Sequence, residues 1–119
     1  MTESAAPTTA AVRVLVRKVL TICECPGRTE LLAQVDGIEY IDGPVTMMRL
    51  HVPRSYPPAA GVPSPVPDAS PTVLNDHGEP IGGLIIWLDN DGYIDLLEYW
   101  WVTDDMPTTL PALDQIERT

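Results

Sequence analysis

The run from Gly82 to Val102, GGLIIWLDNDGYIDLLEYWWV, most narrows what this chain can fold into. It holds two apolar stretches rich in branched and aromatic residues, which favour β-strands. Between them lies Asp91-Gly92, a strong signal for a tight turn because Gly accepts positive φ. The run therefore predicts an antiparallel hairpin in which Trp87 lies opposite Leu96. Such a hairpin must bury at least one of its faces against another layer.

The same run has an alternative interpretation as a calcium-binding loop. Asp89, Asp91, Gly92 and Glu98 fall at the spacing of an EF-hand. The first position of that loop would be Trp87, which supplies no oxygen ligand. The residues before it, GGLIIWL, favour a strand where an EF-hand requires a helix. We therefore expect the hairpin, with no metal and no cofactor.

Two helices are predicted before the first strand. In residues 8–24, Thr8 or Thr9 is a candidate N-cap, and a strand at 12–16 is the alternative. Residues 28–37 predict a second, short helix with Thr29 as its candidate N-cap. The prediction of the first helix is based on apolar residues that recur with a helical period, namely Val12, Leu15, Val16, Val19, Leu20 and Cys23.

The rest of the chain favours strands and loops. Residues 38–41 and 45–52 predict two strands around a turn, and residues 72–75 a short strand. Residues 53–71 hold seven prolines among nineteen residues, so we expect a long Pro-rich loop. We predict one α+β domain over residues 1–119, with residues 1–7 disordered. One or two N-terminal helices pack on a four- to five-stranded antiparallel sheet.

Charge is distributed unevenly along the chain. The net charge is −10, and no Lys or Arg lies between Arg54 and Arg118, whereas eleven Asp and Glu residues do. This excludes a nucleic-acid partner, which requires a basic surface, and permits a basic protein partner. Solubility alone is the alternative explanation. The chain has no apolar run that could span a bilayer and no secretory signal, so we expect a cytoplasmic protein without a membrane partner.

The sequence offers no catalytic constellation, and we expect no enzyme. Cys23 and Cys25 are too few and too closely spaced for a structural zinc site, so core packing is the favoured interpretation. His77 follows Asp76 in a stretch whose composition is typical of a turn. Neither a nucleophile elbow nor a glycine-rich phosphate loop is present.

The hairpin has two apolar faces, which two short helices cannot both cover. We expect the second face to be covered by the Pro-rich loop, by the tail or by another protein. In the last case Trp100 and Trp87 are the predicted anchors, and a two-fold homodimer is one outcome. The first face consists of Leu84, Ile86, Leu88, Leu97, Tyr99 and Trp101, and the second of Ile85, Trp87, Ile94, Leu96 and Trp100.

Together these features predict a small acidic protein-binding module, with an immunity or antitoxin-like protein as its most concrete form. Its binding residues are Trp100, Trp87 and the exposed acids of the hairpin ends. The alternative is a small enzyme or ligand-binding domain with a pocket between the sheet and the Pro-rich loop. The predicted acids are Asp89, Asp91, Asp104 and Asp105.

About half of the chain, mainly residues 31–53 and 78–111, shows a resemblance to a group of known proteins. They include ELLAQV, GPVTMMRLHVP and GEPIGGLIIWLDNDGYIDLLEYWWVTDDMPTTLP. The pattern resembles a group of small uncharacterised acidic actinobacterial proteins. That group has no assigned activity, so the resemblance implies no site residues. The Pro-rich loop and the Cys-Glu-Cys sequence lie outside the shared pattern.

Overall fold

The computed structural model describes residues 6–118. Two helices and six strands follow one another along the chain, and the strands form one antiparallel sheet in the order β1-β2-β5-β4-β3-β6. The α+β architecture is confirmed. The elements are α1 (Thr9–Ile22), α2 (Arg28–Val35), β1 (Glu39–Asp42), β2 (Met47–His51), β3 (Thr72–Leu74), β4 (Pro80–Leu88), β5 (Ile94–Trp101), a 3-10 turn (Leu113–Gln115) and β6 (Ile116–Glu117).

Helix α1 forms where the apolar stripe predicts it, so the alternative strand at 12–16 is wrong. Thr8 is the N-cap, and its hydroxyl accepts a hydrogen bond from the Ala11 N–H at 3.1 Å. The apolar stripe from Val12 to Leu20 is buried against the sheet. Neither helix of residues 6–118 is long and apolar enough to cross a bilayer.

Helix α2 begins one residue earlier than its predicted cap. Gly27 is the N-cap, and Thr29 lies inside the first turn, so the prediction for Thr29 is wrong. The turn after Cys25 already directs the backbone into the helix at Arg28. Near the end of the helix, Gln34 is fully buried.

Strands β4 and β5 form the predicted hairpin. Trp87 lies opposite Leu96, as expected. The register then shifts, because Leu88 pairs with Ile94 and leaves Asp95 as an extra residue. This bulge turns Ile94 into the core, where it is 1% exposed, so its assignment to the second apolar face is wrong.

The Pro-rich loop, residues 53–71, contains no helix or strand, as predicted. It runs beside β4 beyond the end of β3. The Val66 N–H donates to the Ile86 carbonyl at 2.9 Å, and the Ser64 hydroxyl bonds both backbone groups of Leu88. The loop therefore satisfies backbone groups of β4 that would otherwise form an open sheet edge.

The tail after β5 is irregular until it adds a sixth strand, one more than the four to five predicted. Strand β6 pairs with β3 over only two residues, Ile116 and Glu117. So short a strand, after Pro107 and Pro111, has no periodicity of its own. At the other end, residues 1–5 of the predicted disordered segment lie outside the described residues, and Ala6 and Pro7 precede the first helix.

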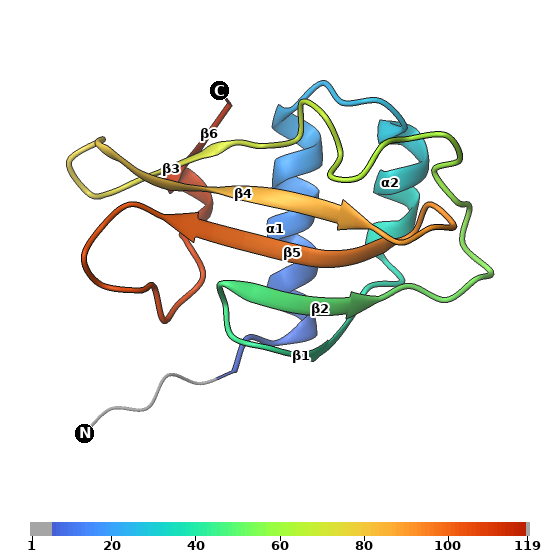
Figure 1. Ribbon diagram of the computed structural model, residues 1–119, viewed down its shortest axis with the longest axis horizontal. Helices are drawn as coiled ribbons and strands as arrows, with labels where there is room; N and C mark the ends of the chain where they lie inside the picture. The colour runs from blue at the N-terminus through green and yellow to red at the C-terminus, as the bar shows by residue number, and fades with distance from the viewer. Residues whose placement is uncertain (1–5, 119) are drawn as a thin grey trace.

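The helices lie on one face of the sheet only. In Figure 1 both helices stand behind the strands, and within residues 6–118 no helix crosses in front of β2, β5 and β4. The first apolar face of the hairpin packs into the core below the helices, except at Trp101, which is 38% exposed. Trp101 ends β5. The opposite face of these strands, which we call the open face, is left without a helical cover.

Candidate functional site

The open face consists of the side chains of β2, β4 and β5 that alternate with the buried ones. Met47 and Trp100 are its most exposed large apolar residues, at 44% and 40%. Three further apolar side chains of the same face are half-buried. Strand pairing therefore collects an apolar surface from three strands. Its members are Met47, Arg49, Ile85, Trp87, Leu96, Glu98 and Trp100.

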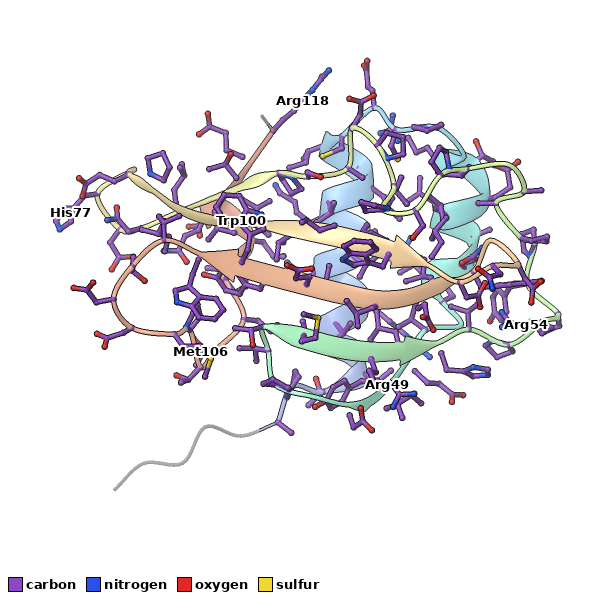
Figure 2. All side chains as sticks on the ribbon, in the orientation of Figure 1. Arg49, Arg54, His77, Trp100, Met106 and Arg118 are labelled. Carbon is purple, nitrogen blue, oxygen red and sulfur yellow. The ribbon has the colours of Figure 1, made fainter. Side chains whose placement is uncertain are left out.

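Trp100 lies directly over β4. Its cross-strand partner is Gly83, and a Cβ added at Gly83 would lie 2.6–2.7 Å from three atoms of the indole. The missing side chain therefore lets one side of the ring pack onto the β4 backbone. Figure 2 shows Trp100 where β4 and β5 run side by side, near the end of β5 that leads to Met106. The rest of the ring is open to solvent.

Trp87 and Glu98 are linked on the same face. The Trp87 indole N–H donates to Glu98 Oε1 at 3.0 Å. Glu98 lies opposite Ile85 and two residues from Trp100, so the carboxylate stands between the two tryptophans along the hairpin. Sequence reasoning named both tryptophans and missed Glu98. The hairpin register already places Glu98 on the face of Trp100, and that was the available signal.

Both carboxylate oxygens of Asp89 accept hydrogen bonds from other residues of the chain. Its Oδ1 accepts the N–H groups of Asp91 and Tyr93 at 2.9 and 3.0 Å, and its Oδ2 accepts from Arg54 at 2.7 Å. The Arg54 guanidinium also lies over the Tyr93 ring, 4.1 Å from its centroid. These bonds hold the turn between β4 and β5, and the role of Asp89 in partner contact stays a prediction.

Asp91, Asp104 and Asp105 are exposed. Asp91 lies in the turn between β4 and β5, whereas Asp104 and Asp105 follow the far end of β5, so the two groups stand at opposite ends of the hairpin (Figure 1). The structure thus brings Trp87 and Trp100 to one face but does not gather the acids. Their role in binding stays a prediction.

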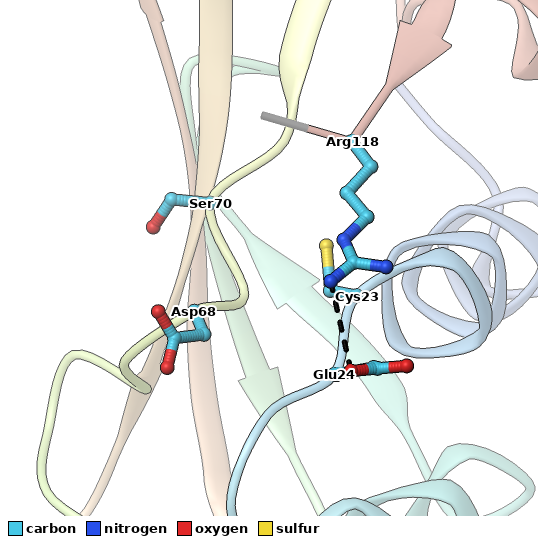
Figure 3. A pocket seen from close by; sticks show the side chains of 5 residues that line it. All are labelled: Cys23, Glu24, Asp68, Ser70 and Arg118. Atoms are coloured by element: carbon cyan, nitrogen blue, oxygen red, sulfur yellow. Dashed lines mark ion pairs between the residues drawn. The ribbon is translucent and has the colours of Figure 1, made fainter.

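A separate hollow of about 520 Å³ lies where α1 ends. It is lined by Cys23 and Glu24, by Asp68 and Ser70 from the end of the Pro-rich loop, and by Arg118 (Figure 3). Arg118 reaches Glu24 at 3.6 Å. The hollow is bounded by the end of α1, by the Pro-rich loop and by Arg118, which directly follows β6. A ligand pocket between the sheet and the Pro-rich loop stays a prediction.

The thiols beside this hollow are packed as sequence reasoning expected. Cys23 and Cys25 are both buried and unpaired by disulfide. Burial, and then the neighbouring Cys25, raise the pKa of the Cys23 thiol. A raised pKa keeps the sulfur protonated and unreactive near neutral pH. This arrangement lacks an activated nucleophile.

The remaining candidate residues, for catalysis or metal binding, either hold a turn or lie too far apart to form a site. The His77 N–H donates to the Asn75 side chain at 2.9 Å, which confirms the turn between β3 and β4. Over residues 6–118, no three His, Cys, Asp or Glu side chains stand close enough together to hold a metal ion. No protein-family model, curated protein or solved structure matches this chain. The resemblance to the actinobacterial group stays a prediction.

Proposed function

We propose that this protein is a small binding module that docks a basic protein partner on the open face of its sheet. The observation that carries the proposal is the apolar surface of β2, β4 and β5, on which Met47 and Trp100 stay exposed without a helix over them. Aromatic residues and Met are enriched at protein interfaces, and Trp is among the residues enriched at the positions that carry most of the binding energy.

Charge favours a basic partner over a second copy of the chain. Each copy carries a net charge of −10, so a two-fold dimer would bring two strongly negative molecules together. A basic partner would instead be attracted to the exposed acids at both ends of the hairpin. Blocking a basic toxin, as immunity proteins and antitoxins do, is the most concrete form of this function.

The test compares two surface variants in capture from a native lysate. Trp100→Ser removes the exposed anchor of the open face. Val14→Ser removes another exposed apolar side chain, which is 50% exposed on α1, on the opposite side of the sheet. We expect a basic protein to be retained by the wild-type chain and by Val14→Ser but lost from Trp100→Ser. Equal retention by all three would contradict the proposal, and so would a self-associated dimer lost on Trp100→Ser.

A further inference from the structure

Trp87, Glu98 and Trp100 form a row along the open face. Trp87 reaches diagonally across the hairpin to bond Glu98 Oε1, and Trp100 follows Glu98 by two residues, roughly 7 Å along the strand. The Trp87 bond occupies one oxygen of the carboxylate and fixes its direction. Within residues 6–118, no cation forms an ion pair with Glu98, whose nearest neighbour on β2 is Met47.

A carboxylate between two indoles is suited to an organic cation. The face of an indole attracts a cation through its quadrupole, and Trp is the most effective side chain for this. The carboxylate adds a charge-assisted hydrogen bond. A guanidinium fits both the indole and the carboxylate, because it is planar, stacks on aromatic rings and donates hydrogen bonds along its edge. An ammonium is instead a compact and strongly hydrated charge.

The same chain already holds one guanidinium in this way. Arg54 lies 4.1 Å from the Tyr93 centroid and donates to Asp89 at 2.7 Å. There the cation comes from the chain itself. On the open face the ring and the carboxylate are present, and no cation of the described residues pairs with them.

We propose that Trp87, Glu98 and Trp100 form the contact site for an arginine side chain of the partner. This inference rests on the proposed function, since it assigns what the docked protein presents to the open face. Trp100, supported by the Gly83 backbone, supplies the stacking surface. Glu98, held by the Trp87 indole, accepts the guanidinium N–H through its second oxygen.

The test uses a short peptide, acetyl-Gly-Arg-Gly-amide, and the indole N–H signals of the protein in heteronuclear NMR. The chain has three tryptophans, so Trp→Phe variants assign the three signals. We expect the arginine peptide to shift the Trp87 and Trp100 signals and to leave Trp101 in place. The matched citrulline peptide has the same shape without charge and should shift neither. A lysine peptide should bind more weakly.

Two charge-removing variants make the test specific. Glu98→Gln can still accept the Trp87 N–H but loses its charge, and should weaken peptide binding about tenfold. Asp95→Asn removes an equal charge from an exposed position of the same strand and should leave binding within about twofold. Equal shifts with citrulline, equal affinity for lysine, no shift at all, or equal loss in both variants would each overturn the arginine site.

The arginine site and the proposed function fail separately. If Trp100→Ser loses the basic partner while Glu98→Gln keeps full affinity for both partner and peptide, the open face is the interface and the arginine site is wrong. If the peptide binds as expected while Trp100→Ser and Val14→Ser retain the partner equally, the cation site stands and the docking surface lies elsewhere.

Discussion

Asp89 holds the turn between β4 and β5 through both of its carboxylate oxygens. Partial burial raises its pKa, but the hydrogen bonds from Tyr93, Arg54 and Asp91 outweigh this effect and lower the pKa below its usual value. A carboxyl group with a lowered folded-state pKa stabilises the fold above its unfolded pKa, about 3.9, and loses that contribution as pH falls through the folded value.

Asp89→Asn should therefore destabilise the protein in a pH-dependent way. At pH 7 we expect a melting temperature lower by about 4–8 °C, the effect of losing about one charge-assisted hydrogen bond in a domain of this size. The difference from wild type should narrow as pH falls below about 4, because the wild-type carboxylate is then protonated. Thermal unfolding from pH 7 to 2 measures this. A constant difference across that range would contradict the assignment.

Gln34 ties three segments together from inside the core. Its Nε2 donates to the carbonyls of Pro57 and Gly92 at 2.9 and 3.0 Å, and its Oε1 accepts the Ile94 N–H at 2.9 Å. Gln34→Leu preserves volume but leaves the buried Ile94 N–H without its partner, whereas the Gly92 carbonyl keeps its bond from the Ala59 N–H. We therefore expect a loss of about 2 kcal/mol or more in unfolding free energy. Denaturant unfolding measures it. Gln115→Leu is the control, because it removes hydrogen bonds to Ala112 and Asp76 at exposed positions and should cost only about 1 kcal/mol.

At the scale of elements, the Pro-rich loop continues the sheet along the edge of β4 without forming a strand. Ser64 is its main polar contact there, since its hydroxyl accepts the Leu88 N–H at 2.8 Å and donates to the Leu88 carbonyl at 3.0 Å. These two hydrogen bonds fix the last residue of β4, just before the turn that Asp89 holds.

Ser64→Ala should loosen that end of the hairpin. We expect faster hydrogen exchange at the Leu88 amide and a loss of about 1–2 kcal/mol, because two backbone groups lose their partner. Ser55→Ala, at an exposed position of the same loop, should leave both quantities unchanged. Slow exchange at Leu88 in Ser64→Ala would mean that the loop does not protect this edge.

Elements with a strong local pattern were predictable, and those fixed by distant contacts were not. The stripe of α1 and the Asp91-Gly92 turn carry their own signal, and both form as predicted. Strand β6 exists only because β3 is beside it, and two residues cannot show a period. The bulge at Asp95 depends on how Ile94 packs and how Gln34 binds its N–H, so alternation alone misplaced Ile94.

In the candidate site, too, features with a local sequence pattern were predictable and those that depend on distant contacts were not. Trp87 and Trp100 were identified because alternation along the hairpin placed both on one face, and the structure keeps them there. The same register places Glu98 on that face, but its bond to Trp87 depends on side-chain geometry that the sequence does not show. Asp89 is half-buried where the sequence predicts an exposed acid, because the sequence does not show that Arg54, 35 residues earlier, pairs with it.

At the scale of the whole molecule, the exposed acids should govern how fast a basic partner arrives. Exposed charges act over about 8 Å at physiological salt and about 3 Å at 1 M, so association should slow as salt rises. Changing Asp104 and Asp105 together to Asn should slow association several-fold, with an almost unchanged melting temperature because both are exposed. Dissociation should depend instead on Trp100. Stopped-flow measurements at several salt concentrations separate the two rates. Rates indifferent to salt and to both aspartates would leave solubility as the only role of these charges.

The open face as docking surface is tested most directly by site-specific photo-crosslinking in a native lysate. A benzophenone side chain replaces Met47 on the open face in one sample and Val14 on α1 in another, two positions that are about equally exposed. We predict that the basic partner is crosslinked from position 47 and not from position 14. A partner crosslinked from position 14, or equally from both, would contradict docking on the open face.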